Sequence, residues 1–297
     1  MDKGRVIALG FFDGVHLGHA ALLRTARQAA ARRGVPAAAL TFDRPPGELV
    51  SGTPVPLINT PGDRAGLMRR LCGIDEVLLC RFDRAMMEMP WESYVEDYLI
   101  GRLRAVHVVC GFDHRFGYRG QGTAERLREA CARLGAGCDV TGEVSRRGVK
   151  VSSTHIRSLL SSGQIEEANQ FLGHPHCLTG TVVHGRQLGR QLGTPTANVL
   201  LPPGVLSPAF GVYAALACFD GRAVPAVTNI GVRPTVRGGD QVTAEPWLLD
   251  FDGDLYGKEL RIEFYRFLRP EQKFPSLEAL RAAILQNAQE TRDFFRP

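Results

Sequence analysis

The segment Arg5-Val-Ile-Ala-Leu-Gly-Phe-Phe-Asp-Gly-Val-His-Leu-Gly-His19 decides the fold of the first half of this chain. Its beginning, Val6–Gly10, is a short run without a charge, which is typical of a strand that is buried on both faces. Glycine and aspartate then indicate a turn, and His19–Arg33 has the composition of a helix. A strand that leads through a glycine-rich turn into a helix predicts an α/β fold.

The alternation of strand and helix continues along the chain. Short apolar strands separated by helices indicate a parallel sheet covered on both faces. The expected fold is therefore a doubly wound, Rossmann-like α/β sheet, in which ligands bind at the carboxyl ends of the strands. The further predicted strands are Pro36–Phe42, Glu76–Cys80 and Val106–Cys110, and the further predicted helices are Gly62–Leu71, Trp91–Leu103, Ala124–Leu134, Ser153–Leu160 and Ile165–Leu172.

The pattern changes after about residue 175. Strand-like segments now follow one another with Gly, Pro and Asp-Gly turns between them, which predicts a small antiparallel β-barrel. A C-terminal helix is expected at Leu277–Gln289, with Ser276 as its cap. The turn-forming Gly173-His-Pro-His176 marks the joint, so we expect two domains, 1–174 and 175–297. The predicted barrel strands are Thr179–His184, Val212–Phe219, Val224–Thr228, Thr243–Phe251 and Leu260–Phe267.

Composition excludes several classes of protein. With 297 residues, of which 44% are hydrophobic and 23% charged, the chain is an ordinary globular protein of about two domains. The net charge is +5, and only four of the 36 cationic residues are lysines. Arginine suits ligands that carry phosphate because its guanidinium is a planar fork of donors, although arginine-rich usage can also reflect genome composition.

No segment predicts export or a membrane span. The longest uncharged run, Gln191–Phe219, contains four prolines and cannot form a membrane helix. The apolar stretch near the N-terminus is too short for a signal peptide, so we expect a cytoplasmic protein. Seven cysteines without a C-x-x-C pair favour neither a zinc ribbon nor a disulfide framework.

The first candidate site is the turn after the first strand. His16 and His19 lie three residues apart at the start of a helix, where free backbone N–H groups and the helix dipole attract an anion. They could stabilise the charge that develops on an α-phosphate under attack. The alternative is two surface histidines. The same turn contributes the predicted ATP-binding residues Gly10, Phe12, Asp13 and Gly18, and the chain has no P-loop motif.

Two later segments are expected at the same site. Gly111-Phe-Asp-His-Arg-Phe-Gly117 follows a predicted strand and therefore also lies at a carboxyl end of the sheet. Ser152-Ser-Thr-His-Ile-Arg157 resembles a helix start, where Ser153 and Thr154 could meet ATP and Arg157 could neutralise the departing pyrophosphate. Taken alone, each segment could equally be structural.

The second candidate site opens the barrel half. Glycines recur at 180, 185, 189 and 193, which allows the backbone to wrap around a polyphosphate. We predict ATP binding at Gly185, Gly189, Arg190 and Gly193. Thr196 and Asn198 offer two hard oxygen ligands, which suit a Mg²⁺ ion that keeps most of its water and contacts phosphate. The alternative is a glycine-rich hairpin loop.

Together these motifs resemble the bacterial bifunctional riboflavin kinase/FAD synthetase family. The first half matches G-x-F-D-G-V-H-x-G-H, G-x-D-x-x-F-G and S-S-T-x-I-R in the family's order. The barrel half matches G-x-V-x-x-G-x-x-x-G-R-x-L-G-x-P-T-A-N at every fixed position. The resemblance implies a nucleotidyltransferase half and a kinase half. The kinase would phosphorylate riboflavin to FMN with ATP and Mg²⁺, and the transferase would adenylylate FMN to FAD and release pyrophosphate.

The resemblance also implies roles for single residues. His16, Gly18, His19 and Arg157 would bind ATP in the transferase half, and Glu245 would act as the general base of the kinase. Asp250 and Asp252 are rival carboxylates, although an Asp-Gly turn favours a structural role. The residues expected to bind flavin are Asp113, Phe116, Asn229, Arg233 and Phe274.

Three positions depart from the family pattern. Pro45 stands where the family usually has a histidine, and His155 replaces an arginine or lysine. Trp247 replaces a histidine after Glu245, and Pro246 removes a backbone donor, which predicts a strand edge or a bulge. Trp247 could stack on a ring or fill the core, and we favour the core.

These departures keep two other interpretations open. The α/β half could have lost transferase activity, which would leave a riboflavin kinase alone. The chain could also be a flavin or nucleotide sensor without catalysis, although a sensor needs no Glu245. Nucleic-acid binding is not expected, because no basic stripe with interleaved aromatic residues occurs. The sequence leaves the oligomeric state open.

Overall fold

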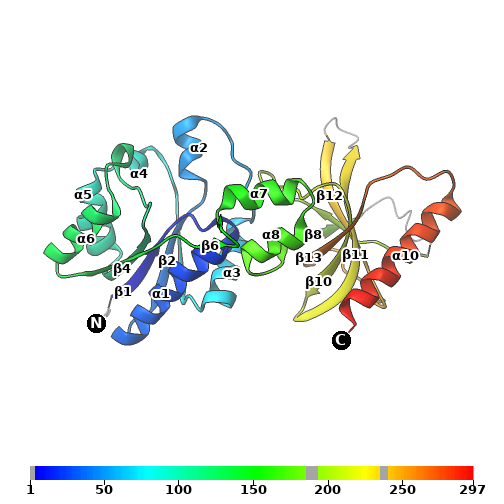
Figure 1. The fold of residues 1–297 in the computed structure, drawn as a ribbon, viewed down its shortest axis with the longest axis horizontal. Coiled ribbons are helices and arrows are strands. Elements are labelled where there is room, and N and C mark those ends of the chain that lie inside the picture. The colour runs from blue at the N-terminus through cyan, green and yellow to red at the C-terminus, as the bar shows by residue number, and fades with distance from the viewer. Residues whose placement is uncertain (1–3, 185–192, 235–239, 297) are drawn as a thin grey trace. The chain divides into compact units, whose positions relative to one another are not determined.

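A computed structural model describes residues 4–184, 193–234 and 240–296 (Figure 1). The chain divides into two compact units. Unit 1 comprises residues 1–55 and 61–152, and unit 2 comprises residues 56–60 and 153–297. This division falls earlier than the joint at residues 173–176. The two predicted domains, 1–174 and 175–297, therefore stay a prediction about independent folding.

Unit 1 is built on a parallel sheet of five strands in the order β3-β2-β1-β4-β5. Every neighbouring pair in this sheet is parallel. The order reverses beside β1, which is the arrangement of a doubly wound sheet, so the predicted fold class is confirmed. The strands are β1 (Arg5–Leu9), β2 (Ala37–Phe42), β3 (Glu76–Cys80), β4 (Ala105–Gly111) and β5 (Gly137–Thr141).

Helices cover both faces of this sheet (Figure 1). One face packs on the longest helix of the unit, α1 (Leu17–Arg33), which also contacts α3 (Pro61–Cys72). The other face forms an apolar core with α6 (Ala124–Arg133) and η2 (Tyr94–Arg102). The remaining elements of unit 1 are η1 (Asp13–Val15), α2 (Pro46–Ser51), α4 (Arg84–Glu88), α5 (Trp91–Ser93), η3 (Tyr118–Gly120), β6 (Ser145–Arg146) and β7 (Val149–Lys150).

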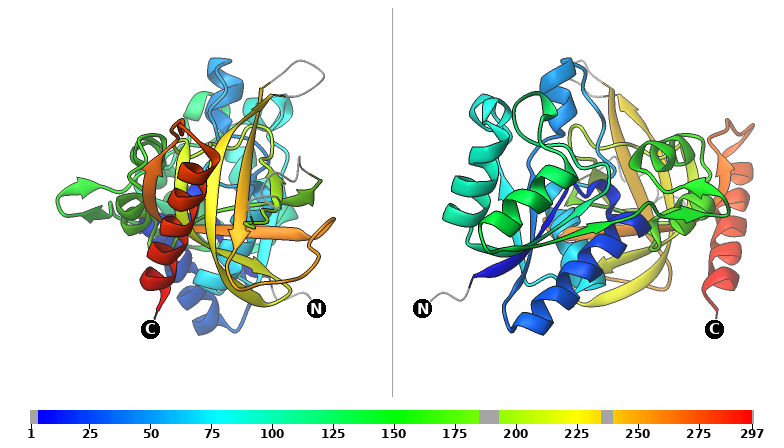
Figure 2. Two further views of the ribbon diagram at one scale, coloured as in Figure 1. Left: turned by 90° about the vertical axis from the view of Figure 1, so that its right-hand side faces the viewer. Right: turned by 60° about the vertical axis from the view of Figure 1, so that its left-hand side comes forward.

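Unit 2 is a closed barrel with the strand order β10-β11-β12-β9-β8-β13, in which all neighbours are antiparallel. The C-terminal helix α10 (Leu277–Phe295) packs on β10 and β11 (Figure 2). The predicted barrel and its helix are confirmed. The other elements are α7 (Ser153–Ser161), α8 (Ile165–Leu172), β8 (His176–Val183), β9 (Asn198–Leu200), β10 (Gly211–Phe219), β11 (Arg222–Pro234), β12 (Asp240–Leu248) and β13 (Glu259–Pro270).

Several predicted boundaries are wrong. The helix expected at Trp91–Leu103 is α-helical only over Trp91–Ser93 and continues as a π-helix. The strand expected at Val224–Thr228 is the middle of the longer β11, and the strand expected at Thr243–Phe251 ends at Leu248. Residues after Leu248 form an Asp-Gly turn instead, which explains why the apolar pattern at Leu249 and Phe251 misled the prediction.

Pro246 does not lie in an edge strand, and the β11–β12 ladder has no bulge. The carbonyl of Pro246 accepts a hydrogen bond from the backbone N–H of Ala197 at 2.9 Å. The N and C=O of one strand residue point to the same side. The missing N–H of Pro246 therefore faces Ala197, where the ladder to β9 has already ended, and pairing with β11 is undisturbed.

All seven cysteines are free thiols, as their spacing predicts. In the described residues, no helix combines the length and the apolar character that a membrane crossing requires.

Candidate active sites in the two units

The turn between β1 and α1 has an unusual backbone. Phe12 and Val15 adopt left-handed conformations with φ of 58° and 42°. A β-branched residue such as valine rarely does so. Gly14 has φ of 80°, and a Cβ atom on Gly10 would lie 2.9 Å from the ring of Phe12. The sequence of this turn is therefore fitted to one shape, with Phe12 and Asp13 buried.

His16 caps the helix that follows. Its Nδ1 atom accepts a hydrogen bond from the backbone N–H of His19 at 3.2 Å. A neutral His16 therefore carries its proton on Nε2. The imidazole rings of His16 and His19 stack, with centroids 3.5 Å apart and planes inclined by 12°. The structure thus brings the two predicted histidines together at the N-terminus of α1.

The pKa of His19 lies well below its usual 6.5, mainly because of burial and further because of the nearby His16 and Arg64. His19 is therefore neutral at pH 7. Its Nδ1 atom is buried and has no hydrogen-bond partner among the described residues. Imidazole N–H groups beside the backbone N–H groups of a helix start can donate hydrogen bonds to an anion.

Arg64 on α3 is completely buried beside this turn, and it is not among the residues predicted for the site. A signal was present in the sequence. Arg64 lies three and four residues before Leu67 and Met68, on the buried face of an amphipathic helix where a cation is unexpected.

The other residues predicted for the transferase site lie in three places. Asp113 is exposed in the loop after β4, and its carboxylate lies 3.9 Å from the ammonium of Lys150. Phe116 is buried in the core of unit 1, where its ring contacts Tyr94. A structural role explains Phe116 fully, so its contact with flavin stays a prediction. A Cβ atom on Gly18 would lie 3.2 Å from the ring of His16, so the ring leaves little room for a side chain there.

Ser153, Thr154 and Arg157 lie in the first turns of α7, within unit 2. The Nε atom of Arg157 donates to the carbonyl of Pro56 at 2.8 Å. The departure at His155 is accommodated by packing, because its ring meets Phe171 edge-on with centroids 4.7 Å apart. Pro45, the other departure in this half, is buried and precedes the first residue of α2.

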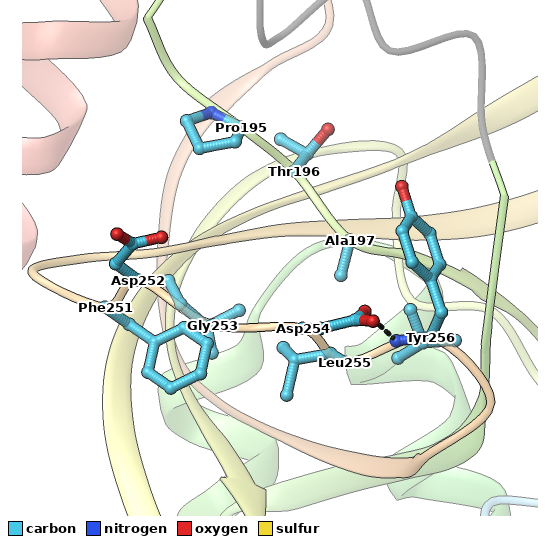
Figure 3. A pocket seen from close by; sticks show the side chains of 11 residues that line it. Pro195, Thr196, Ala197, Phe251, Asp252, Gly253, Asp254, Leu255 and Tyr256 are labelled. Carbon is cyan, nitrogen blue, oxygen red and sulfur yellow. Dashed lines mark hydrogen bonds between the residues drawn. The ribbon is translucent and has the colours of Figure 1, made fainter.

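The barrel contains two adjoining pockets, and Thr196 lines both of them. We call the first the turn pocket. It has a volume of about 590 Å³ and lies between the segment before β9 and the Asp-Gly turn after β12 (Figure 3). The second, the helix pocket, has a volume of about 680 Å³ and is closed on one side by α10.

The helix pocket combines an apolar wall with a carboxylate. Val212, Val227 and Trp247 supply the apolar surface, and Glu245 lies on the same face of β12 as Trp247. Asn229 pairs with Glu245 across the strands, and Phe274 lies beneath the guanidinium of Arg269 at 5.3 Å. Trp247 lines the pocket and packs partly buried against the core, which supports the interpretation as a core residue, while its stacking on a ring stays a prediction.

The turn pocket is polar at its rim. Asp252 and Asp254 are exposed there, and Asp254 accepts a hydrogen bond from the backbone N–H of Tyr256 at 2.9 Å (Figure 3). The ring of Tyr256 stacks on His184, with centroids 3.8 Å apart. Asp250, by contrast, points to α10 and accepts two hydrogen bonds from Arg292, which supports its structural role.

By themselves, Thr196 and Asn198 would make only a weak metal site. One hydroxyl and one amide oxygen carry no charge, and the described residues contain no group of three or more metal-binding side chains. Such a pair fits a Mg²⁺ ion that arrives with its phosphates and retains water. Gly185, Gly189 and Arg190 lie outside the described residues, as does the side chain of Arg233, and Gly193 is exposed.

The turn after the first strand of the doubly wound sheet has the features expected of a phosphate site, and the barrel holds the Glu245 carboxylate in one of two adjoining pockets. This arrangement fits a transferase with two sites. Comparisons with known proteins agree. Residues 1–155 match the family model described as FAD synthetase, and residues 172–295 match the one described as riboflavin kinase. The chain belongs to the bifunctional riboflavin kinase/FMN adenylyltransferase family.

Relatives with this description align over almost the whole chain. The protein of Listeria monocytogenes is 38% identical over 99% of this chain and 93% of its own, and that of Escherichia coli K12 is 37% identical over 99% and 94%. A solved structure from Streptococcus pneumoniae, described as a macrolide-efflux protein, has the same fold. It shows a TM-score of 0.86 and 29% identity over 98% of this chain and 95% of its own.

The chain is therefore an enzyme with two activities. It phosphorylates riboflavin to FMN with ATP, and it adenylylates FMN to FAD with a second ATP.

Proposed function

We propose that riboflavin binds in the helix pocket and ATP in the turn pocket, so that the phosphoryl group crosses at Thr196. The observation that carries this proposal is that Thr196 lines both pockets. The isoalloxazine ring suits the apolar wall, where Trp247 and Phe274 offer aromatic surface. Asn229 and Arg233 lie on β11, the strand next to Glu245, as further flavin contacts.

Glu245 then acts on the flavin hydroxyl. Phosphoryl transfer depends mainly on positioning and on neutralising charge, with one carboxylate to orient and deprotonate the hydroxyl. Thr243 donates to Glu245 Oε1 at 3.4 Å, which restrains the carboxylate at the pocket wall. Thr196 and Asn198 would hold Mg²⁺, which would neutralise phosphate charge. Gly185, Gly189, Arg190 and Gly193 complete the proposed ATP contacts.

At the transferase site, His16 and His19 bind the phosphates of ATP at the N-terminus of α1. Imidazole N–H groups and backbone N–H groups stabilise the charge on the α-phosphate while an FMN phosphate oxygen attacks it and pyrophosphate leaves. Gly10, Phe12, Asp13 and Gly18 give the turn its shape. Ser153, Thr154 and Arg157 stay predicted ATP contacts on the strength of their motif alone, and Asp113 and Phe116 stay predicted flavin contacts.

The proposed setting of both reactions is the cytoplasm. Both consume ATP, and seven cysteines without a disulfide suit a reducing compartment. The partners are then the small-molecule substrates, with neither nucleic acid nor membrane.

Substitution of Thr196 tests the arrangement in the barrel. We expect Thr196→Ala to lower kinase kcat by about 10²-fold, while FAD formation from supplied FMN is unchanged. Thr196→Ser keeps the hydroxyl and should retain most kinase activity. The proposal fails if the alanine variant phosphorylates riboflavin at the wild-type rate, or if the serine and alanine variants lose activity equally.

A further inference from the structure

Arg64 is the largest completely buried side chain of the described residues, and it lies beside the turn that carries the histidine pair. Burial lowers the pKa of Arg64 from 12.5 to about 10, so the guanidinium remains charged at pH 7. Burying a charge is costly unless the charge is hydrogen-bonded. An apolar residue would serve packing alone at lower cost, so this position calls for another explanation.

The guanidinium of Arg64 joins the ends of two neighbouring strands. Its Nη1 atom donates to the carbonyl of Phe11 at 2.9 Å, and its Nη2 atom donates to the carbonyl of Phe42 at 2.6 Å. The guanidinium carbon also lies 4.3 Å from the centre of the Phe11 ring. Arg64 thus connects the chain after β1 to the end of β2, where the carboxyl ends of the strands meet the site.

The Phe11 carbonyl is held twice, since the hydroxyl of Thr41 also donates to it, at 2.7 Å. The next residue, Phe12, has φ of 58°, and Val15 has φ of 42°. Such a strained residue persists only where its surroundings fix it. Arg64 and Thr41 fix the carbonyl that immediately precedes the strained turn.

Titratable groups on several segments lie close to the Arg64 guanidinium. Asp13 on η1 and Asp43 after β2 raise the pKa of Arg64, although burial outweighs them. His16 and Arg64 both lower the pKa of His19, after burial. Loss of the Arg64 charge would therefore make His19 easier to protonate.

We propose that Arg64 is a positioning residue for adenylyl transfer, which holds the turn after β1 in the strained shape that presents His16 and His19 to ATP. Because it is completely buried, it acts through the turn and does not touch substrate. The inference rests on the proposed role of the histidine pair.

The test compares two variants. Arg64→Met removes both the positive charge and the two hydrogen-bond donors of the guanidinium, whereas Arg64→Lys keeps the charge but not the paired donors. Arg69→Met, an exposed position on α3, is the matched control. For each full-length variant, kcat and KM for FMN adenylylation are measured between pH 5 and 9, together with riboflavin phosphorylation and thermal unfolding. Kinase turnover in unit 2 serves as the reference for active protein.

We expect Arg64→Met to lower adenylylation kcat by about 10²-fold, with KM for FMN and ATP changed by less than about threefold. The acid limb of its pH profile should move to higher pH, because the loss of a nearby positive charge raises the pKa of His19. Arg64→Lys should lose about tenfold in kcat with the acid limb unmoved. Arg69→Met should match the wild type in both reactions.

If folded Arg64→Lys has the wild-type kcat, the proposal is overturned, because only the two-pronged guanidinium can bond both carbonyls at once. This variant decides the matter if Arg64→Met does not fold. An acid limb that is unmoved in folded Arg64→Met also overturns it, because a purely structural role would leave that limb in place. His19→Ala is run in parallel. If His19→Ala adenylylates FMN normally, the assignment of the histidine pair is what has failed.

Discussion

Glu245 is the proposed general base of the kinase reaction. It lies on the pocket wall opposite Asn229, with a hydrogen bond from Thr243 that restrains it. A carboxylate in this position can take the proton of the flavin hydroxyl, whereas an amide cannot.

We therefore predict that Glu245→Gln lowers kinase kcat by about 10²- to 10⁴-fold, the usual contribution of a general base. FAD formation from supplied FMN should be unaffected. Initial rates of both reactions on one preparation provide the measurement. Glu259→Gln, an exposed carboxylate on β13, is the control, and equal loss in the two variants would contradict the role of Glu245.

His19 is the corresponding residue of the transferase site. Because its pKa lies well below 6.5, its protonation should leave the rate of FAD formation from FMN constant between about pH 6.5 and 8. A wild-type profile with an acid limb that titrates at pH 6.5 or above would contradict a neutral His19.

Strand β8 carries a histidine, His176, whose burial lowers the stability of the fold. His176 is completely buried, and neither of its ring nitrogens has a hydrogen-bond partner among the described residues. Burial, with a smaller effect from His174, lowers its pKa from 6.5 to about 3. The unfolded chain therefore binds the proton more readily, and stability is lost as the pH falls from about 6.5 towards 3.

We predict that His176→Phe stabilises unit 2 by about 1–2 kcal/mol at pH 7.5, because it removes unsatisfied polar atoms. The ring should stack on Phe264 as His176 does. Urea unfolding at pH 7.5 and pH 5 measures both effects. The gain over the wild type should be larger at pH 5, and a smaller gain there would show that His176 is not the group that titrates.

The elements that the sequence predicts well are those with a clear apolar pattern. β1 to β4 are nearly all-apolar runs, and the glycine-rich turn places His16 at the helix start as expected. β5 was missed because Gly137-Cys-Asp-Val-Thr141 lacks such a run, and its residues are only half-buried. β9 was missed because it has only three residues.

The candidate sites could be predicted only in part from the sequence. Motifs identify residues such as His19 and Thr196, but they give no information on contacts between distant segments. Only the folded chain brings Arg64 to the carbonyls of Phe11 and Phe42, or makes Thr196 a wall of two pockets. The left-handed conformation of Val15 also has no sequence signal, since valine disfavours it.

At the scale of the whole molecule, we expect the two reactions to use separate sets of residues. The histidine pair belongs to unit 1, while Thr196, Asn198 and Glu245 belong to unit 2. We expect FMN made in the barrel to serve as substrate of the transferase after release. A defect in one site should then be complemented by a second chain that is intact there.

The most direct test of this account mixes His19→Ala with Glu245→Gln and supplies riboflavin, ATP and Mg²⁺, with products resolved by chromatography into riboflavin, FMN and FAD. Alone, His19→Ala should stop at FMN, and Glu245→Gln should leave riboflavin unchanged but convert supplied FMN to FAD. The mixture should make FAD from riboflavin. Loss of both reactions in either folded variant, or a mixture that accumulates FMN without FAD, would contradict two separate sites on one chain.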